Sequence, residues 1–274
     1  MLRRFARKTP RALVLFVAVV VTIAPLLWVA STSIKTEKDL YAYPPTIIPA
    51  EPTFEWYPFL VRRGFVQAIL RSCLVSLMAT LIVLGLAGFA AYGFSRYRFR
   101  GKELALLAVL GTQMLPGVIN IIPLYQMMIS FGLLNTLAAV YLILAAMNVP
   151  LAVWMLKGFF DSIPVSLDES ALVDGASRLY TYFRIVVPLA SPGLVAAGVF
   201  TFLFSWNEFI IPLTMTSSSS KRLATVALYL FKTPHETNWA GIASGAMLMM
   251  VPVVLLYLSF NRYFVTGWRG AVKG

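Results

Sequence analysis

Residues 166–188 read SLDESALVDGASRLYTYFRIVVP, a polar, acid-bearing stretch that lies between two apolar runs. Ser166 and Glu169 have the spacing of a capping box, in which each side chain satisfies a backbone N–H at the start of a helix. Gly175 can adopt the left-handed conformation that ends a helix, and a proline cannot continue one. We therefore predict a helix from Ser166, a turn at Gly175 and a second helix that stops before Pro188.

The rest of the chain has the composition of a membrane protein. Its 274 residues are 59% hydrophobic and 12% charged, with a mean hydropathy of +0.79, whereas soluble domains carry about 25% charged residues. A helix needs about 20 apolar residues to cross a bilayer. We therefore predict an all-α integral membrane protein, one transmembrane domain over residues 1–274, with six transmembrane helices at about residues 12–30, 67–94, 103–126, 136–156, 192–215 and 240–260.

Basic residues beside the apolar runs set the predicted orientation. Residues 1–11 hold five of them, and residues 95–102 (SRYRFRGK) hold four. By the positive-inside rule these segments are cytoplasmic, which places both termini, the loop at residues 157–191 and the tail at residues 261–274 inside. The first run is too long for the core of a signal peptide, so we expect it to be retained.

The net charge of +12 does not indicate nucleic-acid binding, because the basic residues cluster beside apolar spans instead of along one polar face. Cys73 is the single cysteine and His235 the single histidine. The sequence therefore predicts neither an intrachain disulfide nor a metal site.

The predicted cytoplasmic helix has a face suited to a partner protein. Ala171 and Ala176, beside Leu172 and Val173, form a low-profile apolar surface bordered by carboxylates. Such a surface can enter a groove on another protein. The alternative is a solvated loop that packs only on its own helix bundle.

Recognition of a motif favours the first of these interpretations. The pattern Glu169-Ser170-Ala171-x-x-Asp174-Gly175-Ala176, followed by Phe183 and Pro188, closely resembles the EAA motif of bacterial ATP-binding-cassette importer permeases. Ser170 stands where that family usually has alanine, a small-for-small difference. Residues 132–136 (GLLNT), 206–209 (WNEF) and 270–274 (GAVKG) resemble the carbohydrate-uptake subfamily, in particular the smaller permease of the maltose-type pair.

The resemblance implies a fold and a set of partners. It implies the type I importer permease fold in the bacterial cytoplasmic membrane, and a heterodimer with a second permease subunit. It also implies two ATPase subunits that hold ATP and Mg, an external solute-binding protein and a carbohydrate substrate. This chain itself is then expected to be no enzyme and to bind no cofactor.

The resemblance also implies two contacts with the ATPase subunits. The EAA loop would form a coupling helix in a groove of the ATPase, through Glu169, Ser170, Ala171, Asp174, Gly175, Ala176, Phe183 and Pro188. The C-terminal tail would add a second contact through Gly270, Ala271, Val272, Lys273 and Gly274; the alternative is a frayed terminus.

A sugar pathway needs hydrogen-bonding groups that face a wet cavity, because polar side chains are costly in lipid. The candidates are Gln113, Asn120, Tyr141, Asn148, Trp206, Asn207 and Glu208. Each can equally hold helices together, and in the maltose-type arrangement the partner permease can supply most sugar contacts.

Other classes of transporter and enzyme remain as alternatives. A glycerol-phosphate or other polyol importer shares the same motifs. A secondary transporter would show more intramembrane ionisable residues and a repeated architecture. A membrane-embedded enzyme would need a nucleophile, a metal cluster or an acid and base pair, which one histidine and one cysteine do not supply.

Overall fold

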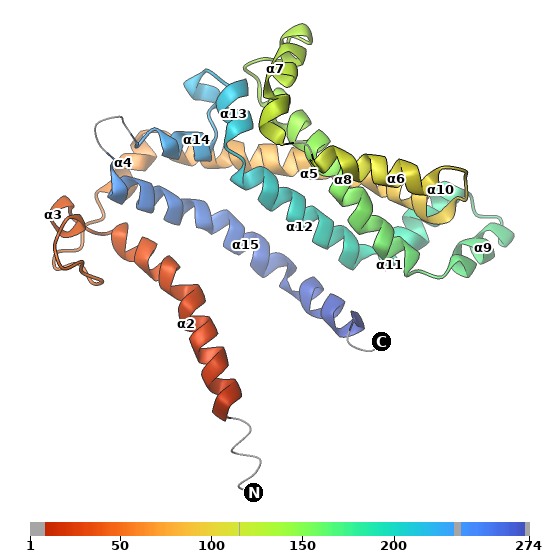
Figure 1. The fold of residues 1–274 in the computed structure, drawn as a ribbon, viewed down its shortest axis with the longest axis horizontal. Helices are drawn as coiled ribbons and strands as arrows, with labels where there is room; N and C mark the ends of the chain where they lie inside the picture. Colours follow the sequence, from red (N-terminus) through yellow and green to blue (C-terminus); the bar gives the residue numbers. More distant parts are fainter. Residues whose placement is uncertain (1–8, 115, 233–236, 272–274) are drawn as a thin grey trace, which may run out of the picture. The chain divides into compact units, whose positions relative to one another are not determined.

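The computed structural model describes residues 9–114, 116–232 and 237–271, with side chains over 13–114, 116–232 and 237–261. Within these ranges the regular structure is helical, apart from one isolated β-bridge between Lys232 and Thr237 (Figure 1). The chain forms two compact units, which are described separately. Unit 1 comprises Met1–Gln67 and Ala227–Val251, and unit 2 comprises Ala68–Val226 and Pro252–Gly274.

Four described helices contain stretches long and apolar enough to cross a membrane. They are α2 (Thr9–Thr32), α5 (Phe65–Arg96), α8 (Leu137–Asp161) and α15 (Trp239–Ala271). The count rises to six if each of two sharply bent helix pairs is one span. The all-helical membrane class is confirmed, while the number of six spans and the inward position of the termini stay predictions.

The predicted span at residues 103–126 is not one straight helix. It consists of α6 (Lys102–Gly111), the 3-10 turns η1 (Thr112–Met114) and η2 (Gly117–Asn120), and α7 (Ile121–Ser130). The two halves meet at 89°. Pro116 explains the break, because it has no N–H to donate and disfavours a helical residue before it.

The predicted span at residues 192–215 is also divided. Helix α12 (Ser191–Asn207) ends at Glu208, which is extended, and α13 (Ile210–Met215) follows. A second bend, of 79°, separates α12 from the helical stretch Arg178–Leu189 that precedes it. The fifth predicted span is therefore two helices with a break beside Glu208.

Unit 2 has a core built on small side chains of α5. Every fourth residue of this helix is fully buried: Val75, Ala79, Val83, Ala87 and Ala91. Residues four apart lie on one helix face, and their small size lets neighbouring helices approach closely. Buried side chains of α8 and α12 join the same cluster, and α8 and α12 run side by side (Figure 1).

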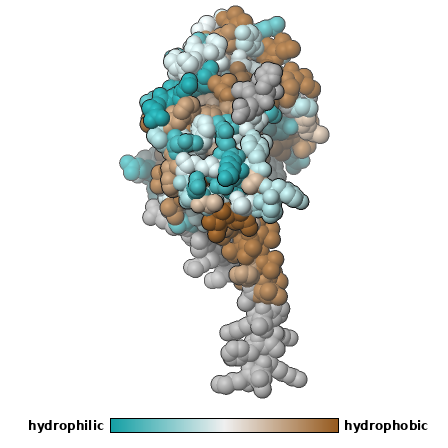
Figure 2. Space-filling model, turned by 90° about the vertical axis from the view of Figure 1, so that its left-hand side faces the viewer, coloured by the Kyte–Doolittle hydropathy of each residue, from teal (hydrophilic) through white to brown (hydrophobic). Residues whose placement is uncertain are grey.

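In unit 1, Ser33 makes a hydrogen bond to the second sequence segment and another within its own segment. The hydroxyl of Ser244 donates to the Ser33 carbonyl at 2.9 Å, and the Ser33 and Tyr57 hydroxyls lie 2.9 Å apart. Two short helices, α3 (Glu37–Leu40) and α4 (Trp56–Arg62), lie between α2 and α5 in the chain. Helix α2 leaves its apolar side chains exposed, which Figure 2 shows as brown surface above the grey N-terminal residues.

Candidate functional site

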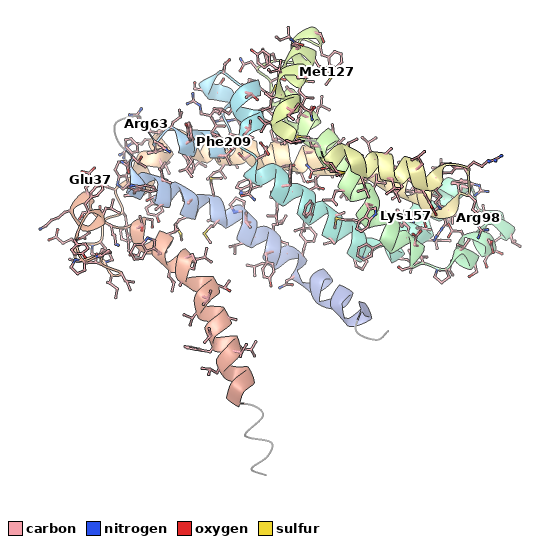
Figure 3. All side chains as sticks on the ribbon, in the orientation of Figure 1. Glu37, Arg63, Arg98, Met127, Lys157 and Phe209 are labelled. Atoms are coloured by element: carbon pink, nitrogen blue, oxygen red, sulfur yellow. The ribbon has the colours of Figure 1, made fainter. Side chains whose placement is uncertain are left out.

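The candidate site is the α9–α11 loop, defined as residues 162–190 between α8 and α12. In unit 2 it lies at the same end as Arg98 and Lys157 (Figures 1 and 3). Its first helix, α9, spans Val165–Val173 with Pro164 as the N-cap, and none of the side chains that the structure describes caps this end. The predicted capping box of Ser166 and Glu169 is therefore wrong. The helix starts one residue earlier because Pro164, with φ −55° and ψ 131°, already sets the direction of entry.

The end of α9 agrees with the prediction from Gly175. This residue has φ +85°, its N–H donates to the Leu172 carbonyl at 3.1 Å, and the Ala176 N–H donates to the Ala171 carbonyl at 2.9 Å. These two bonds define a Schellman motif, which satisfies carbonyls left free at a helix end. The predicted glycine turn is confirmed.

The second helical stretch passes beyond its predicted end. Ser177 caps α10 (Arg178–Thr181), and a π-helical turn, η3 (Tyr182–Val186), leads into α11 (Val187–Leu189). Pro188 therefore lies inside the helical stretch, and the prediction that the helix stops before it is wrong. The π turn gives a physical reason, because its wider spacing accommodates a residue that cannot donate the usual i to i−4 bond.

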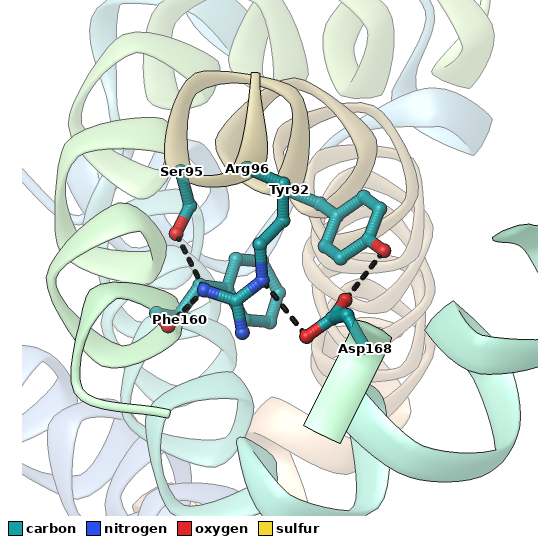
Figure 4. Close-up of polar contacts among 5 residues, drawn as sticks. All are labelled: Tyr92, Ser95, Arg96, Phe160 and Asp168. Carbon is teal, nitrogen blue, oxygen red and sulfur yellow. Dashed lines mark hydrogen bonds and ion pairs between the residues drawn. The ribbon is translucent and has the colours of Figure 1, made fainter. Parts of the chain in front are cut away.

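The main residue that sequence reasoning missed is Asp168, which is buried at 6% exposure. Its Oδ1 accepts a hydrogen bond from the Tyr92 hydroxyl at 2.7 Å, and its Oδ2 accepts one from Arg96 Nε at 3.0 Å (Figure 4). Nη1 of Arg96 also donates to the Phe160 carbonyl at 2.9 Å and to the Ser95 hydroxyl at 3.1 Å. The carboxylate of α9 is thus tied to α5 and, through Arg96, to the last turn of α8.

Aromatic rings attach the second half of the loop to the same helices. The buried Tyr182 ring stacks on Phe89 with centroids 4.9 Å apart and lies 5.1 Å from Tyr92 and 6.3 Å from Phe160. Gly88 makes this contact possible, because a Cβ there would lie 2.5 Å from the Tyr182 hydroxyl oxygen. Both halves of the loop are therefore held on α5.

The outward face of the loop differs in part from the prediction. Glu169, Ser170 and Asp174 are exposed, and Val173 is 87% exposed. Ala171 is buried at 7% exposure, so it is not part of a protruding apolar face as predicted. The reason is that it lies one turn after Asp168, on the side of α9 that faces its own helix bundle.

Most of the predicted coupling residues line one hollow. Its volume is about 660 Å³. It is lined by Leu167, Ser170, Ala171, Asp174, Gly175, Ala176, Ser177, Tyr180 and Ile185. Of the other predicted residues, Glu169 lies outside this hollow, Phe183 is half-exposed with its ring at 85° to the Phe89 ring, and Pro188 is exposed. The loop thus offers a surface with a recess bordered by small side chains and one carboxylate.

The predicted pathway residues are mostly bonded within the fold. The side-chain amides of Asn148 and Asn207 donate to carbonyls one turn earlier in their own helices, each at 2.8 Å. The Gln113 amide donates to the Met147 carbonyl at 2.8 Å. Of the others, Asn120 and Tyr141 are half-buried, and Trp206 is buried with its ring stacked on Phe202.

Glu208 has a local structural role. Its Oε1 accepts hydrogen bonds from the backbone N–H groups of Ile210 at 2.9 Å and Ile211 at 3.3 Å. Its carboxylate therefore satisfies the first N–H groups of α13, where the helix dipole favours a negative charge. This bonding accounts for the acid at the break between α12 and α13.

The predicted C-terminal contact lies partly, and His235 wholly, outside the described residues. Gly270 and Ala271 end helix α15, without described side chains, and Val272, Lys273 and Gly274 lie outside the described residues, as does His235. Over the ranges that the structure describes, no three His, Cys, Asp or Glu side chains gather as a metal site.

Comparison with known proteins gives a consistent assignment. Residues 82–270 match the family described as binding-protein-dependent transport system inner membrane component. The trehalose transport system permease protein SugB of Mycobacterium tuberculosis is 34% identical over 257 residues, 91% of this chain and 92% of that protein. The trehalose/maltose transport system permease protein MalG of Thermococcus litoralis is 29% identical, over 93% of each chain.

A solved structure supports the fold. A chain from the crystal structure of a bacterial ABC transporter involved in the import of the acidic polysaccharide alginate superposes with a TM-score of 0.74 at 18% identity. The match covers 94% of this chain and 96% of that chain. At this identity the likeness concerns the arrangement of the helices alone.

Proposed function

This chain belongs to the family of inner membrane components of binding-protein-dependent transport systems, and from that premise we propose that it is a permease subunit of an ATP-binding-cassette importer for a sugar. The sugar class follows from relatives named for trehalose and maltose transport. A glycerol-phosphate or other polyol substrate is the alternative. The subunit would sit in the bacterial cytoplasmic membrane with both termini inside.

The exposed side chains of the α9–α11 loop are the structural observation that carries this proposal. Glu169 and Asp174 are exposed, and neither carboxylate makes a hydrogen bond within the described part of the chain. Val173 projects beside them at 87% exposure. An anchored loop with free acids and an exposed apolar side chain suits a partner that offers basic groups and a groove. We assign that partner role to an ATPase subunit.

The proposed complex contains this chain, a second permease, two ATPase subunits and an external solute-binding protein. ATP and Mg bind on the ATPase subunits, which would close on ATP and move the loop. The permease pair would then alternate between outward and inward access. This chain supplies binding surfaces and movement and carries out no chemical step.

Copurification tests the assembly, and reconstitution tests the substrate. An affinity tag on this chain, expressed with its neighbouring genes, is expected to bring down one ATPase and one further permease in detergent. In proteoliposomes with the binding protein, labelled trehalose or maltose is expected to accumulate only with ATP. A chain that purifies without an ATPase, or a complex that transports glycerol phosphate and no sugar, would contradict the corresponding half of the proposal.

A further inference from the structure

Attachment of the α9–α11 loop does not by itself explain why Arg96 and Asp168 form a buried ion pair. Asp168 is the single buried carboxylate over residues 13–114, 116–232 and 237–261, and its partner lies 72 residues earlier in the chain. The Asp168 side chain is 8% exposed and the Arg96 side chain is 5% exposed. Burying two charges is costly, and apolar side chains of similar volume often hold a structure as well or better. The pair therefore calls for a reason other than attachment.

The geometry of the pair leaves a spare donor. The Nε edge of an arginine can hold both oxygens of a carboxylate in a two-point fork. Here Oδ2 bonds to Nε, but the Tyr92 hydroxyl takes Oδ1. Nη2 of Arg96 is buried and has no hydrogen-bond partner among the described residues, and Figure 4 draws it without a dashed line. If α9 shifts and Oδ1 leaves Tyr92, the same carboxylate can close on Nη2 without losing Arg96.

Helix α5 is suited to pass on such a shift. Tyr92 and Arg96 are four residues apart near the end of α5 and lie on one face of it. The row of buried residues from Val75 to Ala91 lies along the same helix. A closely packed core does not deform continuously, so movement imposed at one end of a helix is carried along it.

We propose that Asp168 is a positioning residue that transmits movement of α9 to α5 through Arg96, which stays bonded during the movement because Nη2 can replace Tyr92. This inference rests on the proposed function, in which an ATPase moves the loop. It predicts that breaking the pair uncouples ATP hydrolysis from sugar transport without preventing assembly.

The test uses the whole complex in proteoliposomes, with sugar uptake and ATP hydrolysis measured in the same vesicles. In the double variant Arg96→Met with Asp168→Leu, apolar side chains replace both charges. We expect normal complex yield and at least a fivefold fall in sugar transported per ATP hydrolysed. An unchanged ratio would overturn the inference and leave the pair as an attachment alone.

A second ion pair at the same end of unit 2 provides the matched control. Lys157 Nζ lies 2.5 Å from Asp161 Oδ2 within helix α8, and both side chains are partly exposed. The double variant Lys157→Met with Asp161→Leu removes two charges of the same kind without touching α9. Its transport ratio is expected to stay within twofold of wild type, and a fall equal to that of the first double variant would overturn the inference.

Single variants test the role of the spare donor. Tyr92→Phe frees Oδ1 for Nη2, so the transport ratio should stay within twofold. Arg96→Lys keeps the charge but lacks the fork, so the ratio should fall by about as much as in the double variant. A larger fall in the transport ratio for Tyr92→Phe than for Arg96→Lys would overturn the inference. If the apolar double variant does not assemble, Arg96→Lys and the nearly isosteric Asp168→Asn decide the outcome by the same ratio.

Failure of the proposed function would look different. A wild-type complex that hydrolyses no ATP in response to sugar-loaded binding protein would refute the importer assignment. A wild-type complex that transports sugar, with variants that remain fully coupled, would refute the transmission role of Asp168 alone.

Discussion

Asp168 and Glu169 are neighbours in α9, yet the side chain of Asp168 is buried and that of Glu169 is exposed to solvent. Successive residues of an α-helix point about 100° apart, and here that rotation separates a buried carboxylate bonded to Tyr92 and Arg96 from an exposed one with no bond inside the described chain. The inner face fixes where the loop sits. The outer face remains available to another protein.

The contrast extends to the candidate pathway residues. Asn148, Asn207 and Glu208 all bond to backbone groups close by in sequence. Each of these three side chains finds a partner in nearby backbone, where an unpaired polar group would be costly. The Glu169 carboxylate, by contrast, makes no hydrogen bond within the described part of the chain.

The largest expected loss of stability follows from Arg96→Met alone. This change leaves Asp168 buried without its cation, and removing one partner of a buried pair costs about 3–5 kcal/mol. Thermal unfolding of the purified chain in detergent would show it. Lys157→Met, which breaks the more exposed pair in α8, should cost at most about 1 kcal/mol. Equal losses would remove the distinction between buried and exposed pairs.

A smaller loss is expected from Gly175→Val at the turn between the two faces. A side chain in the left-handed conformation costs roughly 1–2 kcal/mol, and β-branching adds to it. A Cβ there meets no atom within 4 Å, so the cost is backbone strain and not a clash. Gly175→Asn, which tolerates this conformation, should lose less.

Gly175→Trp adds bulk beside the outer face and should also reduce the amount of ATPase that copurifies.

Glu208→Gln tests the interpretation of this acid as a helix cap. The amide oxygen can still accept from Ile210, so the loss should be limited to the interaction of charge with the helix dipole, about 0.3–1 kcal/mol. Sugar uptake kinetics should match wild type. A large change in the apparent KM or maximal rate, with unfolding unaffected, would place Glu208 in the transport pathway instead.

The smallest change in stability is expected on the outer face. Glu169→Gln removes an exposed charge that bonds to nothing in the described chain, so the unfolding free energy should move by less than about 0.5 kcal/mol. ATPase association should nevertheless weaken several-fold, which titration of the purified ATPase onto the permease would measure. Loss of stability together with unchanged association would reverse the assignment of inner and outer faces.

The sequence predicted one of three local features of the loop correctly, the glycine turn, although all three depend on residues close together in the chain. Gly175 predicted the turn correctly, since few other residues adopt positive φ at low cost. The capping box failed because Pro164 competed for the same helix start, and Pro188 failed as a stop signal because a π turn accommodated it.

The bonds that hold the loop in place were not accessible in the same way. Arg96 is one of the four basic residues in 95–102 that set the predicted orientation, and no sequence motif singles out Asp168 among the acids of the loop. Their pairing depends on how α5, α8 and α9 pack, and no spacing rule connects positions 72 residues apart. The breaks beside Pro116 and Glu208 had local signals, but apolar runs suggested continuous spans.

The order of synthesis gives the Arg96–Asp168 pair one more consequence. Both hydrogen-bond partners of the Asp168 side chain, Tyr92 and Arg96, precede it in the chain, and Arg96 is made 72 residues before it. At about 5–20 residues per second, the arginine waits about 4 to 14 s for its carboxylate. During that interval the end of α5 lacks the contact that anchors it, so a nascent chain released before residue 168 should leave this end open to quality-control proteases.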